Sequence, residues 1–180
     1  MLASKWTGQD VSGWWLSEKL DGCRAFWDPT TCTLRTRGWK PIAAPDWFTA
    51  NFPAITLDGE LFAGYGTLEL VKVLVEFPRA DDAAWRRVRF MAFDAPTVAA
   101  IPVERRFEVA QRIAERAGLG WVQERRCIGA EDARATLAAV VARGGEGLVL
   151  RRPGHCYEFG RSRAWQKVKP NCHFASPRVL

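Results

Sequence analysis

The sequence predicts an α+β domain with largely antiparallel sheets. Short strand-like runs come first, amphipathic helices follow later, and the two do not alternate in the regular rhythm of βαβ units. Charged residues and glycines fall mostly at the ends of the predicted strands, where a cleft between two sheets would collect them. With 180 residues, the chain is long enough for one domain with a real hydrophobic core.

The N-terminal third reads as strands, because turn signals such as Asp-Gly and Asp-Pro end its apolar and aromatic runs. We expect strands over 14–19, 23–28 and 32–38, then a short helix over 44–52 and a strand with an internal turn over 54–64.

The remainder mixes helices and strands. Apolar residues three and four apart predict the helices, and Pro102 and Gly118 bound the clearest of them. We expect helices over 67–77, 102–118 and 130–145, and strands over 86–96, 121–128, 146–152 and 165–170.

The bulk composition favours a polyanionic partner inside the cell. The net charge is +6 and the isoelectric point is near 9.4, so nucleic acid is the first candidate. No apolar run approaches 18 residues, and the N-terminus lacks the apolar core of a signal peptide. Five scattered cysteines without a CxxC pattern suit a reducing cytoplasm, where we expect the protein to reside.

Lysine is rare in this chain, and its placement points to chemistry. Only 6 of the 26 basic residues are lysine, and an amine can lose its proton and attack an electrophile, whereas a guanidinium cannot. Lys19 stands two residues before Asp21 and Gly22 in SEKLDGCRAFWD, where glycine lets the backbone approach a ligand closely. We interpret Lys19 as a nucleophile, for which nearby cationic charge favours the reactive neutral form.

Five short segments extend this interpretation. They are KLDG (19–22), DGE (58–60), FDAP (93–96), EGLVLR (146–151) and KVK (167–169). In this order they resemble the covalent nucleotidyltransferase superfamily of ATP-dependent DNA ligases, RNA ligases and mRNA capping enzymes. The residues around Lys19, together with TRGWK, look most like small phage and bacterial ATP-dependent DNA ligases. The resemblance runs from about Trp14 to Lys169 and implies a nucleotidyltransferase (ATP-grasp-like) fold, with the AMP cleft between two sheets flanked by helices.

The resemblance implies that ATP is the cofactor and transfers AMP to Lys19. It also implies that Asp21 contacts the reacting phosphate region or the nick. Lys167 and Lys169 are two residues apart, so a strand would place both amines on one face, where one would meet adenine or the α-phosphate and the other the phosphate. The implied catalytic residues are thus Lys19, Asp21, Lys167 and Lys169.

Two carboxylates and one aromatic residue complete the implied cofactor site. Glu60 resembles the family carboxylate that binds the AMP ribose and helps to hold a metal ion, and Glu146 resembles the one that positions this metal. Carboxylate oxygens suit Mg²⁺ or Mn²⁺. Phe93 corresponds to the residue that stacks on adenine, which requires only a flat π-face.

Three arginines are implied to contact phosphate, because the arginine fork binds phosphate oxygens in pairs. Arg161 resembles the phosphate contact of a Gly-Arg-Ser segment. Arg37 resembles the residue that grips the 5′-phosphate at a nick, and Arg24 the residue that reads the same phosphate zone. The implied partner is nicked double-stranded DNA, bound by a monomer.

The function expected is therefore nick sealing through lysyl-AMP. An ATP-dependent RNA ligase and a non-catalytic module that binds nicks or nucleotides stay open as alternatives, whereas mRNA capping fits less well because it uses GTP. We expect residues 1–180 to form a single adenylation domain, without the OB-fold domain that normally follows it in the family.

Overall fold

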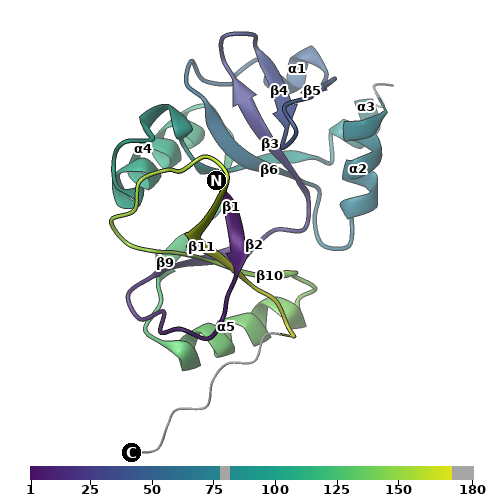
Figure 1. Ribbon diagram of the computed structural model, residues 1–180. Coiled ribbons are helices and arrows are strands. Elements are labelled where there is room, and N and C mark those ends of the chain that lie inside the picture. The colour runs from purple at the N-terminus through teal and green to yellow at the C-terminus, as the bar shows by residue number, and fades with distance from the viewer. Residues whose placement is uncertain (78–81, 172–180) are drawn as a thin grey trace, which may run out of the picture.

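Two β-sheets with helices packed against them make up the fold (Figure 1). The structure is a computed structural model and describes residues 1–77 and 82–171. The larger sheet has the order β5-β4-β3-β6-β7-β8, formed by β3 (Cys23–Asp28), β4 (Thr33–Thr36), β5 (Pro41–Ile42), β6 (Leu57–Phe62), β7 (Arg89–Asp94) and β8 (Gly120–Trp121). The smaller sheet has the order β1-β11-β10-β2-β9, formed by β1 (Leu2–Lys5), β2 (Trp15–Lys19), β9 (Glu124–Arg126), β10 (Gly147–Arg151) and β11 (Arg161–Val168). The pairs β1–β11 and β7–β8 are parallel and the others antiparallel, which confirms the predicted fold class.

The predicted helices are present with shorter bounds. They are α1 (Asp46–Thr49), α2 (Leu68–Glu76), α4 (Val103–Arg116) and α5 (Ala130–Ala142), and the structure adds α3 (Asp82–Trp85) and a 3₁₀ turn, η1 (Pro96–Val98). Pro102 caps the start of α4, and Gly118 follows its end with a positive φ of 70°, as the sequence indicated. None of the helices in the described ranges is both long and apolar enough to cross a membrane.

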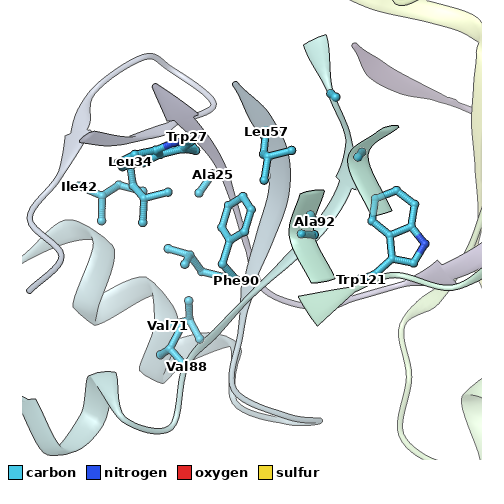
Figure 2. Packing of buried hydrophobic residues seen from close by; sticks show 14 of the residues in the cluster. Ala25, Trp27, Leu34, Ile42, Leu57, Val71, Val88, Phe90, Ala92 and Trp121 are labelled. Atoms are coloured by element: carbon cyan, nitrogen blue, oxygen red, sulfur yellow. The ribbon is translucent and has the colours of Figure 1, made fainter. Parts of the chain in front are cut away.

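Each sheet has its own hydrophobic core. The larger core lies between the six-stranded sheet and helices α2, α3 and α4, and Figure 2 shows Trp27, Phe90 and Trp121 among its buried side chains. The smaller core packs α5 against β10. A third cluster joins the two sheets through Met1, Tyr157 and Trp165, with Phe93 packed against it. Each sheet thus has a core of its own, and this third cluster lies where the two sheets meet.

The predicted turn inside residues 54–64 is wrong. Residues 57–62 form one continuous strand, and Asp58-Gly59 marks a shift of register against β7 instead of a reversal. A Cβ on Gly59 would lie 2.5 Å from Cζ of Phe90, so the strands approach closely there and only glycine fits.

The predicted strand over 121–128 is also wrong as a single element. Gly120–Trp121 ends the larger sheet beside β7, whereas Glu124–Arg126 pairs with β2 at the edge of the smaller one. The chain therefore crosses between the sheets here. Strands β1 and β5 were not predicted, and β11 begins at Arg161, earlier than the predicted 165.

A fully buried ion pair between Arg106 of α4 and Asp94 of β7 holds the helix against the strand. Arg106 and Asp94 are both 0% exposed, and Nε of Arg106 donates to Oδ1 of Asp94 at 2.8 Å. The same guanidinium donates to the backbone carbonyls of Ile101 at 2.7 Å and His155 at 2.9 Å, so it also ties down two connecting segments. Burial raises the pKa of Asp94, against the opposing effect of Arg106.

Removing Arg106 should therefore destabilise the fold strongly. We expect Arg106→Met to lower the free energy of unfolding in urea by about 3–5 kcal/mol, because it leaves the Asp94 carboxyl buried without its partner. Adding Asp94→Asn should recover part of the loss. Arg105→Met is the matched control, since Arg105 is exposed on the same helix turn and should matter little. Equal losses for Arg105→Met and Arg106→Met would contradict the role of the buried pair.

Candidate active site

A cavity of about 590 Å³ lies between the two sheets, with walls from both. The smaller sheet contributes residues of β2, β10 and β11, and the larger sheet contributes residues of β3, β6 and β7. Seven of the predicted site residues line the cavity: Lys19, Arg24, Arg37, Glu60, Phe93, Arg161 and Lys167.

Lys19 is the last residue of β2 and stands where the chain leaves the smaller sheet. It lies opposite Gly147 of β10, and β3 of the larger sheet begins four residues later, at Cys23. Between them, a Cβ on Gly22 would lie 2.1 Å from the carbonyl oxygen of Leu61. Only glycine permits this crossing, which agrees with the close backbone approach expected of the Asp-Gly pair. Asp21 is half-buried in the connection and is not among the residues that line the cavity.

Glu146 links two lysines beside the cavity. Its carboxylate accepts a hydrogen bond from Nζ of Lys19. The other carboxylate oxygen, Oε1, forms an ion pair with Nζ of Lys169 at 2.6 Å. Burial of the Glu146 carboxyl would raise its pKa, but the hydrogen bonds from Lys169 and Lys19 outweigh burial and hold the pKa below its ordinary value. The carboxylate is therefore ionised and paired at neutral pH.

The predicted common face of Lys167 and Lys169 does not extend to the second lysine. Strand β11 ends at Val168, so the alternation of faces stops before Lys169. Lys167 lines the cavity, whereas the exposed Lys169 reaches Glu146 from beyond the end of the strand.

Glu60 has the opposite electrostatic setting to Glu146. It is half-buried, lines the cavity from β6 and is closely surrounded by protein. Burial raises its pKa from 4.5 to about 7, even though Lys19 and Arg24 act in the other direction. The carboxyl therefore titrates near neutral pH and gains by accepting a cation or a hydrogen-bond donor.

The predicted arginines differ in how many of their N–H donors already form hydrogen bonds within the protein. Arg24 donates from Nε and Nη2 to the buried Asp58, at 2.9 and 2.5 Å, so its fork is engaged inside the protein. The exposed Arg37 forms no ion pair or hydrogen bond with the part of the chain that the structure describes, and Arg161 has one long contact of 3.4 Å to the carbonyl of Ala3. Arg37 and Arg161 thus keep donors for an anion, whereas the geometry of Arg24 favours a supporting role.

Sequence reasoning missed Arg151, the last residue of the EGLVLR segment. Arg151 lines the cavity and is 3% exposed, and its guanidinium carbon lies 4.4 Å from the centre of the Trp165 ring and 5.5 Å from that of Phe93. One donor reaches the Ser17 hydroxyl at 3.4 Å, and Nε has no hydrogen-bond partner within the described ranges. Its position as the last residue of β10, five residues after Glu146, was the available signal.

The two carboxylates suit a divalent cation that is shared with a substrate. Among residues 1–77 and 82–171, no three His, Cys, Asp or Glu side chains come close enough to hold a metal by themselves. Mg²⁺, however, usually takes only one or two carboxylates and completes its shell with water and substrate phosphates. Glu60, whose raised pKa means that a bound cation would stabilise its ionised form, and the ionised Glu146 fit that requirement.

The two sheets, the cavity between them and a lysine at the seam define a nucleotidyltransferase domain, the class predicted from the sequence. The chain belongs to the family of the ATP-dependent DNA ligase domain, whose family model matches residues 4–169.

Individual relatives agree with this assignment. A DNA ligase of Haemophilus influenzae is 30% identical over 172 residues, covering 94% of this chain and 62% of that protein, so the chain spans less than two thirds of this relative. A solved structure from work on Lig E DNA ligases, described as DNA binding with a minimal scaffold, is 37% identical with a TM-score of 0.84, covering 93% of this chain and 67% of its own. The ligase domain of LigD from M. tuberculosis shares the fold, with 23% identity and a TM-score of 0.68, over 93% of this chain and 59% of its own.

The raised pKa of Glu60 makes the stability of the empty protein depend on pH. Below pH 4.5 the carboxyl is protonated in both the folded and the unfolded chain. As the pH rises from 4.5 to about 7, the unfolded chain has released this proton while the folded chain still holds it, so stability is lost over this range, by up to about 3 kcal/mol. Glu60→Gln should remove this loss and be the more stable protein in urea at pH 8, with little difference at pH 4. The exposed Glu131→Gln is the control, and a Glu60→Gln curve parallel to wild type at all pH values would refute the assignment.

Proposed function

We propose that this chain is the nucleotidyltransferase domain of an ATP-dependent DNA ligase that seals nicks in duplex DNA through lysyl-AMP on Lys19. The observation that carries the proposal is the position of Lys19 at the seam of the two sheets, lining the cavity and hydrogen-bonded to Glu146. The family membership and the two carboxylates with different pKa values support it.

Lys19 supplies the nucleophile in the first step. Its Nζ forms a bond to the α-phosphorus of ATP and loses a proton, and pyrophosphate leaves. An oxygen of the 5′-phosphate at the nick then attacks the same phosphorus, and Lys19 leaves and regains a proton. The 3′-hydroxyl finally attacks the 5′-phosphate, the phosphodiester forms, and AMP leaves.

Glu146 orients the nucleophile before this reaction. It holds the Lys19 amine at the end of β2, and Lys169 provides a second cation on the same carboxylate. Because Lys169 remains, Glu146 keeps a cationic partner when Lys19 turns toward a phosphate. Mg²⁺ or Mn²⁺ held by Glu60 and Glu146 would offset the negative charge on the transferring phosphate.

The cavity walls divide between base and phosphate. We assign Phe93 to stack on adenine and Arg151 to donate to an acceptor on the base edge, because both line the cavity side by side. Arg37, Arg161 and Lys167 line it as well and have donors for phosphate oxygens.

The proposed substrate is nicked double-stranded DNA, and we propose a monomer in the cytoplasm as its setting. Nicked DNA and nicked RNA of one sequence, sealed in parallel, test the substrate. Faster sealing of RNA would favour an RNA ligase, and covalent AMP without sealing of either would favour a different acceptor.

Replacing Lys19 should abolish covalent AMP. We expect wild type incubated with ATP and Mg²⁺ to gain the mass of one AMP, and Lys19→Ala and Lys19→Arg to gain none, since arginine keeps the charge but cannot act as the nucleophile. Lys72→Arg is the matched control and should behave as wild type, since Lys72 is a half-buried residue of α2 that pairs with Glu69 and does not line the cavity. Covalent AMP on Lys19→Arg would show that another residue is the nucleophile.

Replacing Arg37 should weaken DNA binding through electrostatics. The logarithm of affinity for nicked DNA should fall linearly with the logarithm of salt concentration, and Arg37→Met should reduce that slope by about 0.9 if Arg37 neutralises one phosphate. The exposed Arg116→Met, on a helix away from the cavity, should leave the slope unchanged. A slope that Arg37→Met does not alter would remove Arg37 from the DNA-binding surface.

A further inference from the structure

Arg143 connects the two sheets beside the candidate nucleophile. It is the residue at which α5 ends, and its Nη2 forms an ion pair with Oε2 of Glu18 at 2.6 Å. Its Nε donates to the Tyr65 hydroxyl at 2.9 Å. Glu18 belongs to β2 and directly precedes Lys19, whereas Tyr65 follows β6 of the larger sheet.

Arg143 also stands at the start of the segment that carries Glu146. Gly144 and Gly145 separate the two residues, and Gly144 has a positive φ of 89°. A Cβ on Gly145 would lie 2.4 Å from Cγ1 of Val140 and 2.8 Å from Oε1 of Glu18, so a larger residue does not fit there. The segment is therefore glycine by geometric necessity, and glycine has no side chain with which to hold its conformation.

The amides of Gly144 and Gly145 donate to the carbonyls of Val141 and Val140, both at 2.9 Å, and the contacts of Arg143 add a side-chain constraint to these backbone hydrogen bonds. Its fork joins the start of this segment to β2, the strand that ends at Lys19. On the other side, the Tyr65 side chain covers Gly144, since its Cβ lies 3.4 Å from where a Cβ of Gly144 would stand. The connection after β6 and the end of α5 lie side by side (Figure 1).

We propose that Arg143 is a positioning residue for the adenylylation of Lys19, a role that rests on the proposed function. Through Glu18 and Tyr65 it fixes the Gly144-Gly145 segment, so that Glu146 meets the Lys19 amine in one geometry. Arg143 does not line the cavity, so it acts through Glu146 and Lys19 and not on the nucleotide.

Without the contacts of Arg143, the rate of lysyl-AMP formation should fall more than the affinity for ATP. In single-turnover formation of lysyl-AMP, we expect Arg143→Met to lower the maximal rate about tenfold or more, because small displacements of reacting groups are costly. The ATP concentration for half-maximal rate should stay as in wild type. Tyr65→Phe removes one hydrogen bond and should lower the rate by about fivefold.

The conservative variant separates positioning from charge. Lysine keeps a cation opposite Glu18, but it lacks the fork that reaches Glu18 and Tyr65 together. Arg143→Lys should therefore behave like Tyr65→Phe and not like Arg143→Met. Arg112→Met is the matched control, because Arg112 is exposed and forms no ion pair or side-chain hydrogen bond with residues 1–77 and 82–171.

Hydrogen exchange of the backbone amides of residues 144–147, without ATP, provides a readout that does not require activity. Arg143→Met should accelerate exchange there and leave the rest of β10 and α5 unchanged. Wild-type exchange and a wild-type maximal rate in Arg143→Met would overturn the proposal, as would a rise in half-maximal ATP with no change in maximal rate. Wild-type protein that forms no lysyl-AMP would sink the proposed function instead, and the exchange result would still decide whether Arg143 fixes the segment.

Discussion

The site depends on one constraint of the backbone, the passage from the smaller sheet to the larger within the three residues that separate Lys19 from Cys23. Gly22 lies against the carbonyl of Leu61 in β6, so the connection enters the larger sheet at a distance that only glycine allows. Because β2 and β3 belong to different sheets, the last residue of β2 must stand at their seam. The position of Lys19 thus follows from the topology, and the rest of the site is arranged around it.

Charge pairing then distinguishes residues of the same type within a small volume. Glu146 is surrounded by two lysines and has a lowered pKa, whereas the closely surrounded Glu60 has a raised one. Arg24 is bound to Asp58, while Arg37 keeps its donors for a partner. Whether a charged side chain supports the fold or is available to a ligand therefore depends on its hydrogen-bond and ion-pair partners within the protein, and not on its residue type.

The sequence predicted those features that depend only on residues close together in the chain. Helix α4 could be placed because Pro102 and Gly118 act on their own turns, and the five motifs contributed residues to the cavity from both sheets. Asp58-Gly59 misled because the same pair suits a turn or a bulge, and only the approach of Phe90 decides between them. The change of sheet after Trp121 and the pairing of Arg24 depend on distant strands, so no pattern in the sequence could reveal them.

Arg151 gives the cavity a further property. Arg151 is 3% exposed and its Nε has no hydrogen-bond partner within the described ranges, and a buried donor without a partner costs stability. A nucleotide that offers an acceptor at this place would complete the core as well as occupy the site. Ligand binding and folding are then coupled, with a stabilisation that grows by RT ln(1 + [L]/Kd). A ligand that pairs this donor would therefore raise the free energy of unfolding as well as fill the cavity.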